Sequence, residues 1–132
     1  MSEPRPVLSM SREWPWGLAV LADPSSSEPV PEQLNADGVA GGRSVVAVGI
    51  QHGADGEAIA EVWLGRAPDD GMVCVYDDGF ETLSAAVTLS DAGWEQKLGA
   101  DVGDGPHHLR VLVTERGSPE RVVFELVPSA TR

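Results

Sequence analysis

Apolar residues occur along this chain in short runs, and turn-forming residues separate the runs. None of the runs has the length and the 3.6-residue period of a long amphipathic helix. Short β-branched and aliphatic runs between Gly, Pro, Asp and Ser clusters are typical of antiparallel sandwiches and barrels. The pattern predicts an all-β fold, an antiparallel two-sheet β-sandwich of jelly-roll or C2-like type with about eight strands. The expected strands are Val7 to Met10, Trp16 to Ala22, Ser44 to Gln51, Ala58 to Leu64, Met72 to Tyr76, Leu83 to Leu89, His107 to Thr114 and Arg121 to Val127.

Alternation within the last two runs indicates which side chains face the core. In the run from His107 to Thr114, the residues Leu109, Val111 and Val113 fall on one face of an extended strand. We expect that face to be buried. In the run from Arg121 to Val127 both alternating sets contain apolar residues, which predicts a strand that is covered on both sides for part of its length.

Turn signals are frequent. Glycine supplies the positive φ of tight turns, and aspartate tolerates that conformation and hydrogen-bonds its own backbone. We expect a hairpin between the runs 44–51 and 58–64, with its turn at Gly53 to Gly56. The Asp-Gly pairs are Asp37-Gly38, Asp55-Gly56, Asp70-Gly71, Asp78-Gly79 and Asp104-Gly105.

The segment from Asp23 to Arg43 differs from the rest of the chain, because it is rich in proline, serine and glycine. Connections of this length are uncommon in a compact domain. We predict a long, partly ordered loop that crosses one end of the sandwich. The expected organisation is a single domain over residues 7–128, with a disordered N-terminal tail at 1–6 and a C-terminal tail at 129–132.

Acidic residues outnumber basic ones, 21 to 9, and the excess is concentrated. Between Asp55 and Asp104 there are 12 carboxylates against only Arg66 and Lys97, so this stretch carries −10 of the total −12. Phosphate-backbone binding draws its affinity from Lys and Arg, so direct nucleic-acid binding is disfavoured. The charge fits a basic protein partner, and it equally fits a solvated surface that keeps a small protein soluble.

The single cysteine and the first residues of the chain indicate its cellular location. Cys74 is the single cysteine and lies in an apolar run, where we expect it to be a small buried hydrophobe. The first residues, Met1 to Pro6, are polar and proline-rich, and no apolar segment follows them. We therefore expect no signal peptide, no membrane contact and a cytoplasmic location.

Motifs for cofactors and metals are missing. The glycine-rich segment from Gly38 to Ser44 lacks the lysine of a phosphate loop, and a strand rather than a helix follows it. His107 and His108 are neighbours on a predicted strand, so their rings point to opposite faces and could not readily share one ion. We expect no cofactor and no metal site.

Catalytic motifs are missing as well. The doublets Asp69-Asp70 and Asp77-Asp78 bracket one predicted strand, and about 3.3 Å per residue places them roughly 23 Å apart, far beyond the spacing of a paired-carboxylate glycosidase. No nucleophile-elbow sequence is present. The chain is therefore predicted not to be an enzyme.

Tryptophan and carboxylates are the residues that suggest binding. Trp63 alternates with two apolar neighbours and is expected to face outward, and Trp94 lies in a polar stretch. Exposed tryptophan beside carboxylates is typical of protein-binding hot spots, although packing in the core is the commoner role of any one tryptophan. The candidate partner-binding residues are Asp69, Asp70, Asp77, Asp78, Glu81, Trp63 and Trp94.

The order of these elements resembles the competence protein ComJ family. The segment Gly105-Pro106-His107-His108-Leu109-Arg110-Val111-Leu112-Val113 is similar to that family's glycine turn and arginine-bearing strand, and Val122 to Pro128 resembles its closing strand. Leu8 to Ser11 and Leu18 to Leu21 match its opening in layout. The resemblance implies a β-sandwich that works by binding protein, with a nuclease as the candidate partner.

Our leading hypothesis is a non-catalytic, acidic β-sandwich that binds another protein, as an inhibitor or immunity-like protein acting on a basic partner such as a nuclease. One alternative is a small-molecule or carbohydrate-binding sandwich that uses Trp63 or Trp94 as a stacking platform. A second alternative is a structural or assembly subunit. A homo-oligomer is compatible with all three.

Overall fold

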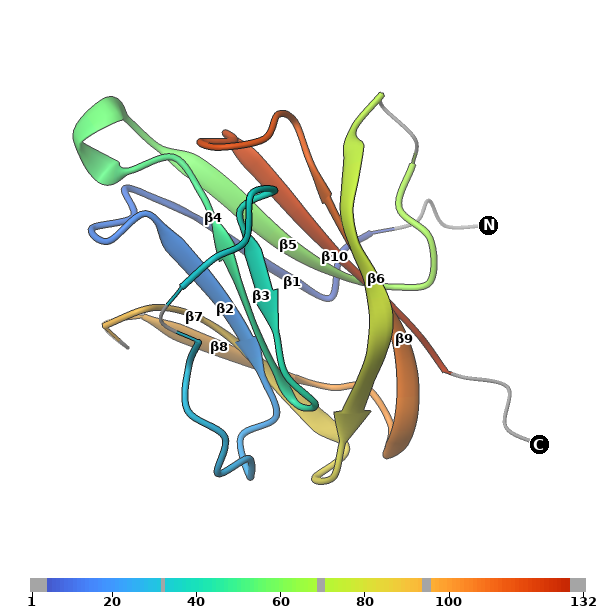
Figure 1. The fold of residues 1–132 in the computed structure, drawn as a ribbon. Coiled ribbons are helices and arrows are strands. Elements are labelled where there is room, and N and C mark those ends of the chain that lie inside the picture. Colours follow the sequence, from blue (N-terminus) through green and yellow to red (C-terminus); the bar gives the residue numbers. More distant parts are fainter. Residues whose placement is uncertain (1–4, 32, 69–70, 94–95, 129–132) are drawn as a thin grey trace.

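The computed structural model describes residues 5–31, 33–68, 71–93 and 96–128, which form strands and one short 3-10 helix (Figure 1). Every run predicted as a strand contains one. Two further strands are present: β3 lies in the segment that we expected to be a loop, and β8 lies in a segment to which no strand was assigned. The elements are β1 (Leu8–Arg12), β2 (Leu18–Ala22), β3 (Val39–Gly41), β4 (Val45–Gly49), η1 (Gly53–Asp55), β5 (Ala58–Leu64), β6 (Val73–Thr82), β7 (Ala86–Asp91), β8 (Lys97–Asp101), β9 (Gly105–Val113) and β10 (Arg121–Pro128).

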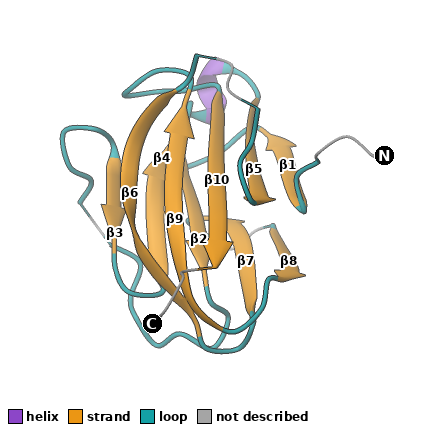
Figure 2. Cartoon of the chain, turned by 90° about the vertical axis from the view of Figure 1, so that its right-hand side faces the viewer, coloured by secondary structure: helices purple, strands orange, loops and turns teal. Residues whose placement is uncertain are grey.

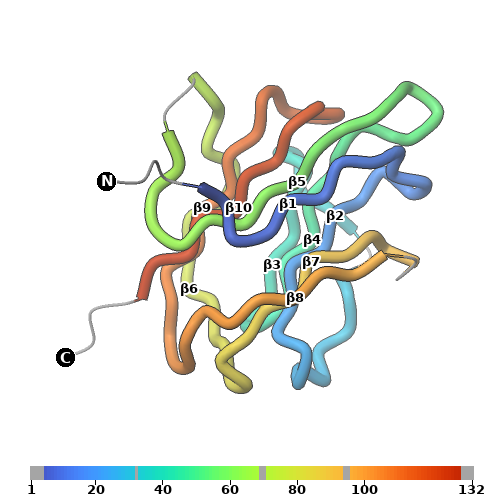
Figure 3. Tube along the Cα trace, turned by 180° about the vertical axis from the view of Figure 1, so that it is seen from behind, coloured from blue at the N-terminus to red at the C-terminus, as the bar shows by residue number. Residues whose placement is uncertain are grey.

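The strands form two five-stranded sheets that pack face to face (Figure 2). The first sheet has the order β1-β5-β10-β9-β6, and the second has the order β3-β4-β2-β7-β8. The predicted two-sheet β-sandwich is therefore confirmed. One pair departs from the expected antiparallel pattern, because β5 and β10 run parallel. On the side seen in Figure 3, β1 and β8 contact each other across the edges of the two sheets.

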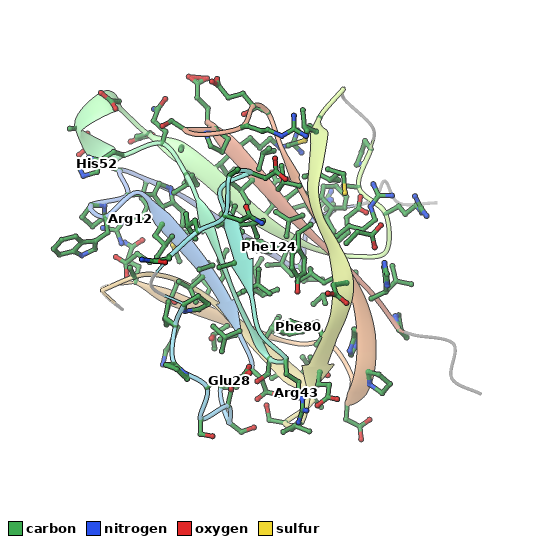
Figure 4. The ribbon with its side chains drawn as sticks, viewed as in Figure 1. Arg12, Glu28, Arg43, His52, Phe80 and Phe124 are labelled. Carbon is green, nitrogen blue, oxygen red and sulfur yellow. The ribbon has the colours of Figure 1, made fainter. Side chains whose placement is uncertain are left out.

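One apolar layer between the sheets forms the core. The face of β9 that was expected to be buried is buried, since Leu109, Val111 and Val113 all belong to this layer. Phe80 and Phe124 lie in the same layer (Figure 4). Both alternating sets of β10 are largely buried, as predicted for a strand covered on both sides.

The expected hairpin between the runs 44–51 and 58–64 is wrong. β4 pairs with β2 and β3 in the second sheet, whereas β5 pairs with β1 and β10 in the first. The turn residues predicted at 53–56 do form a turn, the helix η1, but this turn carries the chain from one sheet to the other. Local turn chemistry predicts a reversal of the chain, and it does not determine which partner the second strand will find.

The long loop after β2 covers the outer face of the second sheet. Val30 and Leu34 pack on a cluster that includes Val20 and Ala47, which explains why β2 and β4 are apolar on both faces. Within the segment 23–43, β3 adds a short edge strand to the sheet. The loop is thus part of the packing of the sandwich.

Two carboxylates fix this loop to the strands. Asp23 is buried and accepts four hydrogen bonds, from the backbone N–H and the hydroxyl of Ser25 and of Ser84, at 2.7 to 3.0 Å. Burial acts to raise the pKa of Asp23, but the hydrogen bonds from Ser84 and Ser25 outweigh it, so the pKa lies below its ordinary value. Glu28 accepts the backbone N–H of Ser44 at 2.6 Å and that of Arg43 at 3.1 Å.

Glycine is required at the close approach of β3 to β6. A Cβ atom on Gly41 would lie 2.3 Å from the hydroxyl oxygen of Tyr76. Such a distance is far inside van der Waals contact, so any side chain at this position must displace the Tyr76 ring. The contact joins the two sheets on the side opposite β1 and β8 (Figure 1).

Replacing Asp23 with Asn is expected to lower the free energy of unfolding by about 2 to 3 kcal/mol near neutral pH, because hydrogen bonds to a charged acceptor are lost. Since the pKa of Asp23 is lower in the folded than in the unfolded state, the carboxylate's contribution is complete above the unfolded-state pKa. It disappears as the pH falls through the folded-state pKa. The free energies of unfolding of the wild type and the variant, measured with urea from neutral to acid pH, should therefore converge as the pH falls. A penalty that persists unchanged in acid would contradict this explanation.

Gly41→Ala is expected to destabilise the protein by about 1 to 3 kcal/mol, since the added methyl group overpacks the contact with Tyr76. Gly99→Ala is the matched control on another edge strand, because a Cβ there would lie 3.6 Å from its nearest neighbour. In the background Tyr76→Ala the Gly41→Ala penalty should largely disappear. Equal penalties in both backgrounds, measured by urea unfolding, would show that the ring is not the obstacle.

Candidate functional site

The predicted acidic residues that the structure describes all lie on one strand. Asp77, Asp78 and Glu81 belong to β6, the edge strand of the first sheet. The sequence predicted a strand that ends at Tyr76 with a turn at Asp78-Gly79, and this is wrong, because β6 continues through both residues to Thr82. Asp69, Asp70 and Trp94 lie outside the described residues.

Two backbone N–H groups of β6 outside its pairing with β9 are hydrogen-bonded. Asp78 accepts a hydrogen bond from the backbone N–H of Gly79 at 2.8 Å, and the carbonyl of Arg43 accepts the N–H of Glu81 at 2.9 Å. A β-bulge interrupts the pairing with β9 between Cys74 and Tyr76. Bulges and charged side chains are devices that protect edge strands from pairing with other chains. A partner that approaches this edge would therefore meet carboxylate side chains rather than a row of free backbone groups.

The carboxylates of β6 point to different sides. Asp77 lies on the outer face of the first sheet and pairs with His108. Asp78 lies on the same side as Tyr76. The pKa of Tyr76 is raised, first by burial and then by the negative charges of Asp78 and Glu28.

A negative region therefore lies at the corner between β6 and the β3–β4 turn. Glu81 is 3.9 Å from the Nε of Arg43, a loose pair between exposed side chains. Such pairs contribute little to stability. Figure 4 shows Arg43 and Glu28 together at this end of the molecule. We call Glu28, Asp78 and Glu81 the acidic corner.

Trp63 was expected to be exposed, and this is wrong. Its side chain does lie on the outer face of the first sheet, but the residue is only 5% exposed, because it packs with Leu112, Val123 and the segment that follows β5. Its indole N–H donates to Glu61 at 3.0 Å. Alternation correctly places Trp63 on the outer face of the sheet, but it does not predict that the segment after β5 covers the side chain.

Trp16 is the tryptophan that sequence reasoning missed. It is 67% exposed at the apex of the turn between β1 and β2. The N–H of Gly17, which has φ of 64°, donates to the carbonyl of Trp14 at 3.1 Å and closes this turn. The sequence Trp-Pro-Trp-Gly indicates this turn, because Pro and Gly on either side of Trp16 are typical turn residues.

The turn that bears Trp16 is held rigidly. Trp14 is fully buried and its indole donates to the carbonyl of Ala58 at 2.9 Å. The carbonyl of Trp14 also accepts the N–H of Gly53, which joins the turn to η1. Glu13, at the start of this turn, and Asp55, in η1, are also exposed. We call Trp16, Glu13 and Asp55 the tryptophan turn.

The remaining candidate chemistry is limited. Cys74 was expected to be buried but is exposed, because the edge strand turns it toward the outer face. His107 is buried and His108 lies on the outer face, so the two histidines do not share a site. Within the described ranges, no three His, Cys, Asp or Glu side chains converge in a way that could hold a metal ion. No helix in the same ranges has the length and apolar character needed to cross a membrane.

The contrast between Trp16 and Trp63 can be measured in solution. The fluorescence that Trp16→Phe removes is expected to be strongly quenched by acrylamide, whereas the fluorescence that Trp63→Phe removes is expected to be shielded, because only the first indole is open to solvent. Each contribution is the difference between the wild-type and variant emission. Equal quenching constants would contradict the two placements.

Comparisons with known proteins identify a shared fold. No family model matches the chain, and no curated protein matches it in sequence. Among solved structures, the chain is similar to ComJ from Bacillus subtilis, described as an inhibitor of the DNA degrading activity of NucA, with a TM-score of 0.71 and 12% identity. The similarity covers 97% of this chain and 100% of ComJ. The resemblance inferred from the sequence is thus supported by three-dimensional structure, and the chain has the ComJ fold.

Proposed function

We propose that this protein is a non-catalytic protein-binding module of the inhibitor type, and that its partner presents a basic surface such as the cleft of a nuclease. The observation that carries the proposal is the likeness to ComJ over nearly the whole chain. ComJ inhibits the DNA degrading activity of NucA. At 12% identity only the fold is common ground, so the identity of the partner is left to experiment. We expect the protein to act in the cytoplasm without a cofactor.

The charge supports a basic partner. A protein with a formal charge of −12 on 132 residues attracts cationic surfaces over a distance of about one Debye length, roughly 8 to 10 Å at physiological ionic strength. Such steering accelerates encounter more than it strengthens the final complex. A nuclease cleft must itself be cationic to bind phosphates, so an acidic protein is suited to cover it.

Two described surfaces could make the short-range contacts. The acidic corner offers the carboxylate of Glu28 in the loop and those of Asp78 and Glu81 on an edge strand, two of whose backbone N–H groups are already hydrogen-bonded. The tryptophan turn offers a large exposed indole on a rigid support, and the exposed Glu13 and Asp55 belong to the same turn and to η1. Burial of a preorganised tryptophan is a common source of binding energy, because little conformational entropy is lost on contact. We propose that the acidic corner steers the partner and that Trp16 anchors it.

The alternative function, a small-molecule or carbohydrate site with Trp63 or Trp94 as a stacking platform, cannot use Trp63, because its indole is buried. Trp16 projects from the apex of a turn, whereas carbohydrate and cofactor sites are concave. The described tryptophans therefore favour contact with a macromolecule. The assembly-subunit alternative predicts a stable oligomer, which light scattering of the purified protein would detect.

The direct test is capture of a partner followed by a quantitative binding assay. The tagged protein is used to capture partners from the source lysate at about 0.01 M and about 0.15 M salt. The captured proteins are identified, and binding of the purified partner is measured by calorimetry together with its nuclease activity. We expect a basic partner whose activity falls as the inhibitor approaches equimolar amounts. Recovery of no partner at either salt, or of a partner whose activity is unchanged, would contradict the proposal.

Variants separate steering from anchoring. Trp16→Ala is expected to raise Kd at least tenfold, the effect of about 1.4 kcal/mol. The double change Asp78→Lys and Glu81→Lys should mainly slow association at low salt. Glu115→Lys and Glu120→Lys together are the matched control, because they change the net charge equally at exposed positions outside both surfaces. If the control slows association as much as the β6 variant does, the corner has no special role.

A further inference from the structure

A groove crosses the outer face of the first sheet, on the side away from the core. It consists of two hollows of about 290 Å³ and about 200 Å³ that share Arg66, Arg110 and Glu125 in their walls. Arg66 belongs to the segment that follows β5, and the other two residues lie on β9 and β10. The groove plays no part in the proposed function above.

Cations gather on this face of an otherwise acidic protein. Among the acids described on this face, Glu61 pairs with Arg121 at 2.9 Å and Glu125 with Arg110 at 3.3 Å, and Asp77 is hydrogen-bonded to His108. Arg66 is exposed and has no ion pair or hydrogen bond among the described residues. One guanidinium is therefore left over beside the groove.

A second arginine, Arg110, lies in the wall of the groove beside Glu125. The Nε of Arg110 is buried, and within the described part of the chain it makes no hydrogen bond, although Glu125 lies at ion-pair distance. The side chain of Glu125 is almost fully buried, and its other oxygen accepts the N–H of Ala67 at 2.8 Å. The Arg110 side chain as a whole is partly exposed, so it is the second cationic group in the wall of the groove.

The larger hollow has an apolar side. Met72 and Leu112 line it, and both pack in the cluster that contains Trp63. A ligand with an apolar body would bury surface against these side chains while its anionic end met the two arginines. Guanidinium groups match carboxylates well, since both are planar and can form two parallel hydrogen bonds.

The neighbouring carboxylates limit the charge of the ligand. Glu125 forms part of both hollows and Asp77 lies on the same face, so each additional negative charge on a ligand is repelled. The net charge of −12 acts in the same direction. A single negative charge can be compensated by Arg66, whereas a dianion such as phosphate leaves one charge uncompensated.

We propose that this groove is a binding site for a compact monocarboxylate with an apolar body, held by Arg66 and Arg110 above the Trp63 cluster. The volume of the larger hollow is at the lower end of the range for small-molecule sites, which suits a single ring or a short branched chain. The site is independent of the acidic corner and the tryptophan turn. Its failure would leave the proposed protein-binding function untouched.

The test uses benzoate as the probe, with benzamide and inorganic phosphate as comparison ligands, in NMR titrations of the ¹⁵N-labelled protein. We expect saturable amide shifts confined to the segments 66–68, 72–74, 108–112 and 123–127, with a Kd on the order of 1 mM. Benzamide, which has the same shape without the charge, should bind at least about tenfold more weakly, because it lacks charge-assisted hydrogen bonds. Phosphate should also bind more weakly than benzoate.

Arg66→Gln is the diagnostic variant, since Arg66 is exposed and its replacement leaves no buried charge. It should raise the Kd for benzoate about tenfold. Arg43→Gln is the matched control at an exposed arginine away from the groove, and its Kd should equal that of the wild type. The proposal is overturned if benzoate shifts do not saturate in these segments, if benzamide or phosphate binds as tightly as benzoate, or if Arg66→Gln has no effect.

Discussion

Burial of one apolar layer between two sheets, each with its outer face partly covered as well, is the constraint on which the rest of this structure depends. Phe80, Phe124 and the inward residues of β9 form the middle layer. The loop after β2 covers the second sheet, and the segment after β5 covers Trp63 on the first. Central strands that are apolar on both faces can be accommodated only in this way, because exposed apolar strands invite aggregation.

The same constraint sorts the polar groups. Carboxylates that remain inside the coverings have specific partners, as Asp23 has in Ser25 and Ser84, and Glu125 has in Arg110 and Ala67. The carboxylates of Asp77, Asp78 and Glu81 lie on the edge strand β6, and those of Glu13 and Asp55 are exposed on the β1–β2 turn and on η1. In a sandwich of this kind the accessible polar and charged side chains lie at the edges, ends and outer faces. Binding by surface contact follows more naturally from this arrangement than catalysis in a deep pocket.

Most of the strands could be predicted from the sequence, because alternation and turn residues are local properties. The inward face of β9 and the two-sided burial of β10 are examples. Pairing could not be predicted, since β4 and β5 have the turn of a hairpin but find partners in different sheets. The predicted exposure of two side chains was wrong for a related reason. Trp63 is buried because a segment whose position cannot be derived from alternation covers it. Cys74 is exposed because β6 is an edge strand. β3 and β8 were missed because they are short and contain glycine, and edge strands of this kind carry little apolar signal.

The central claim is that two preformed surfaces of the sandwich, the acidic corner and the tryptophan turn, contact a basic protein. Hydrogen exchange of the chain with and without its captured partner tests this most directly. The account predicts slower exchange at residues 14–17, 53–55 and 76–82, with the core strands β9 and β10 unchanged. Protection confined to the loop between β2 and β3, or spread evenly over the whole chain, would contradict it.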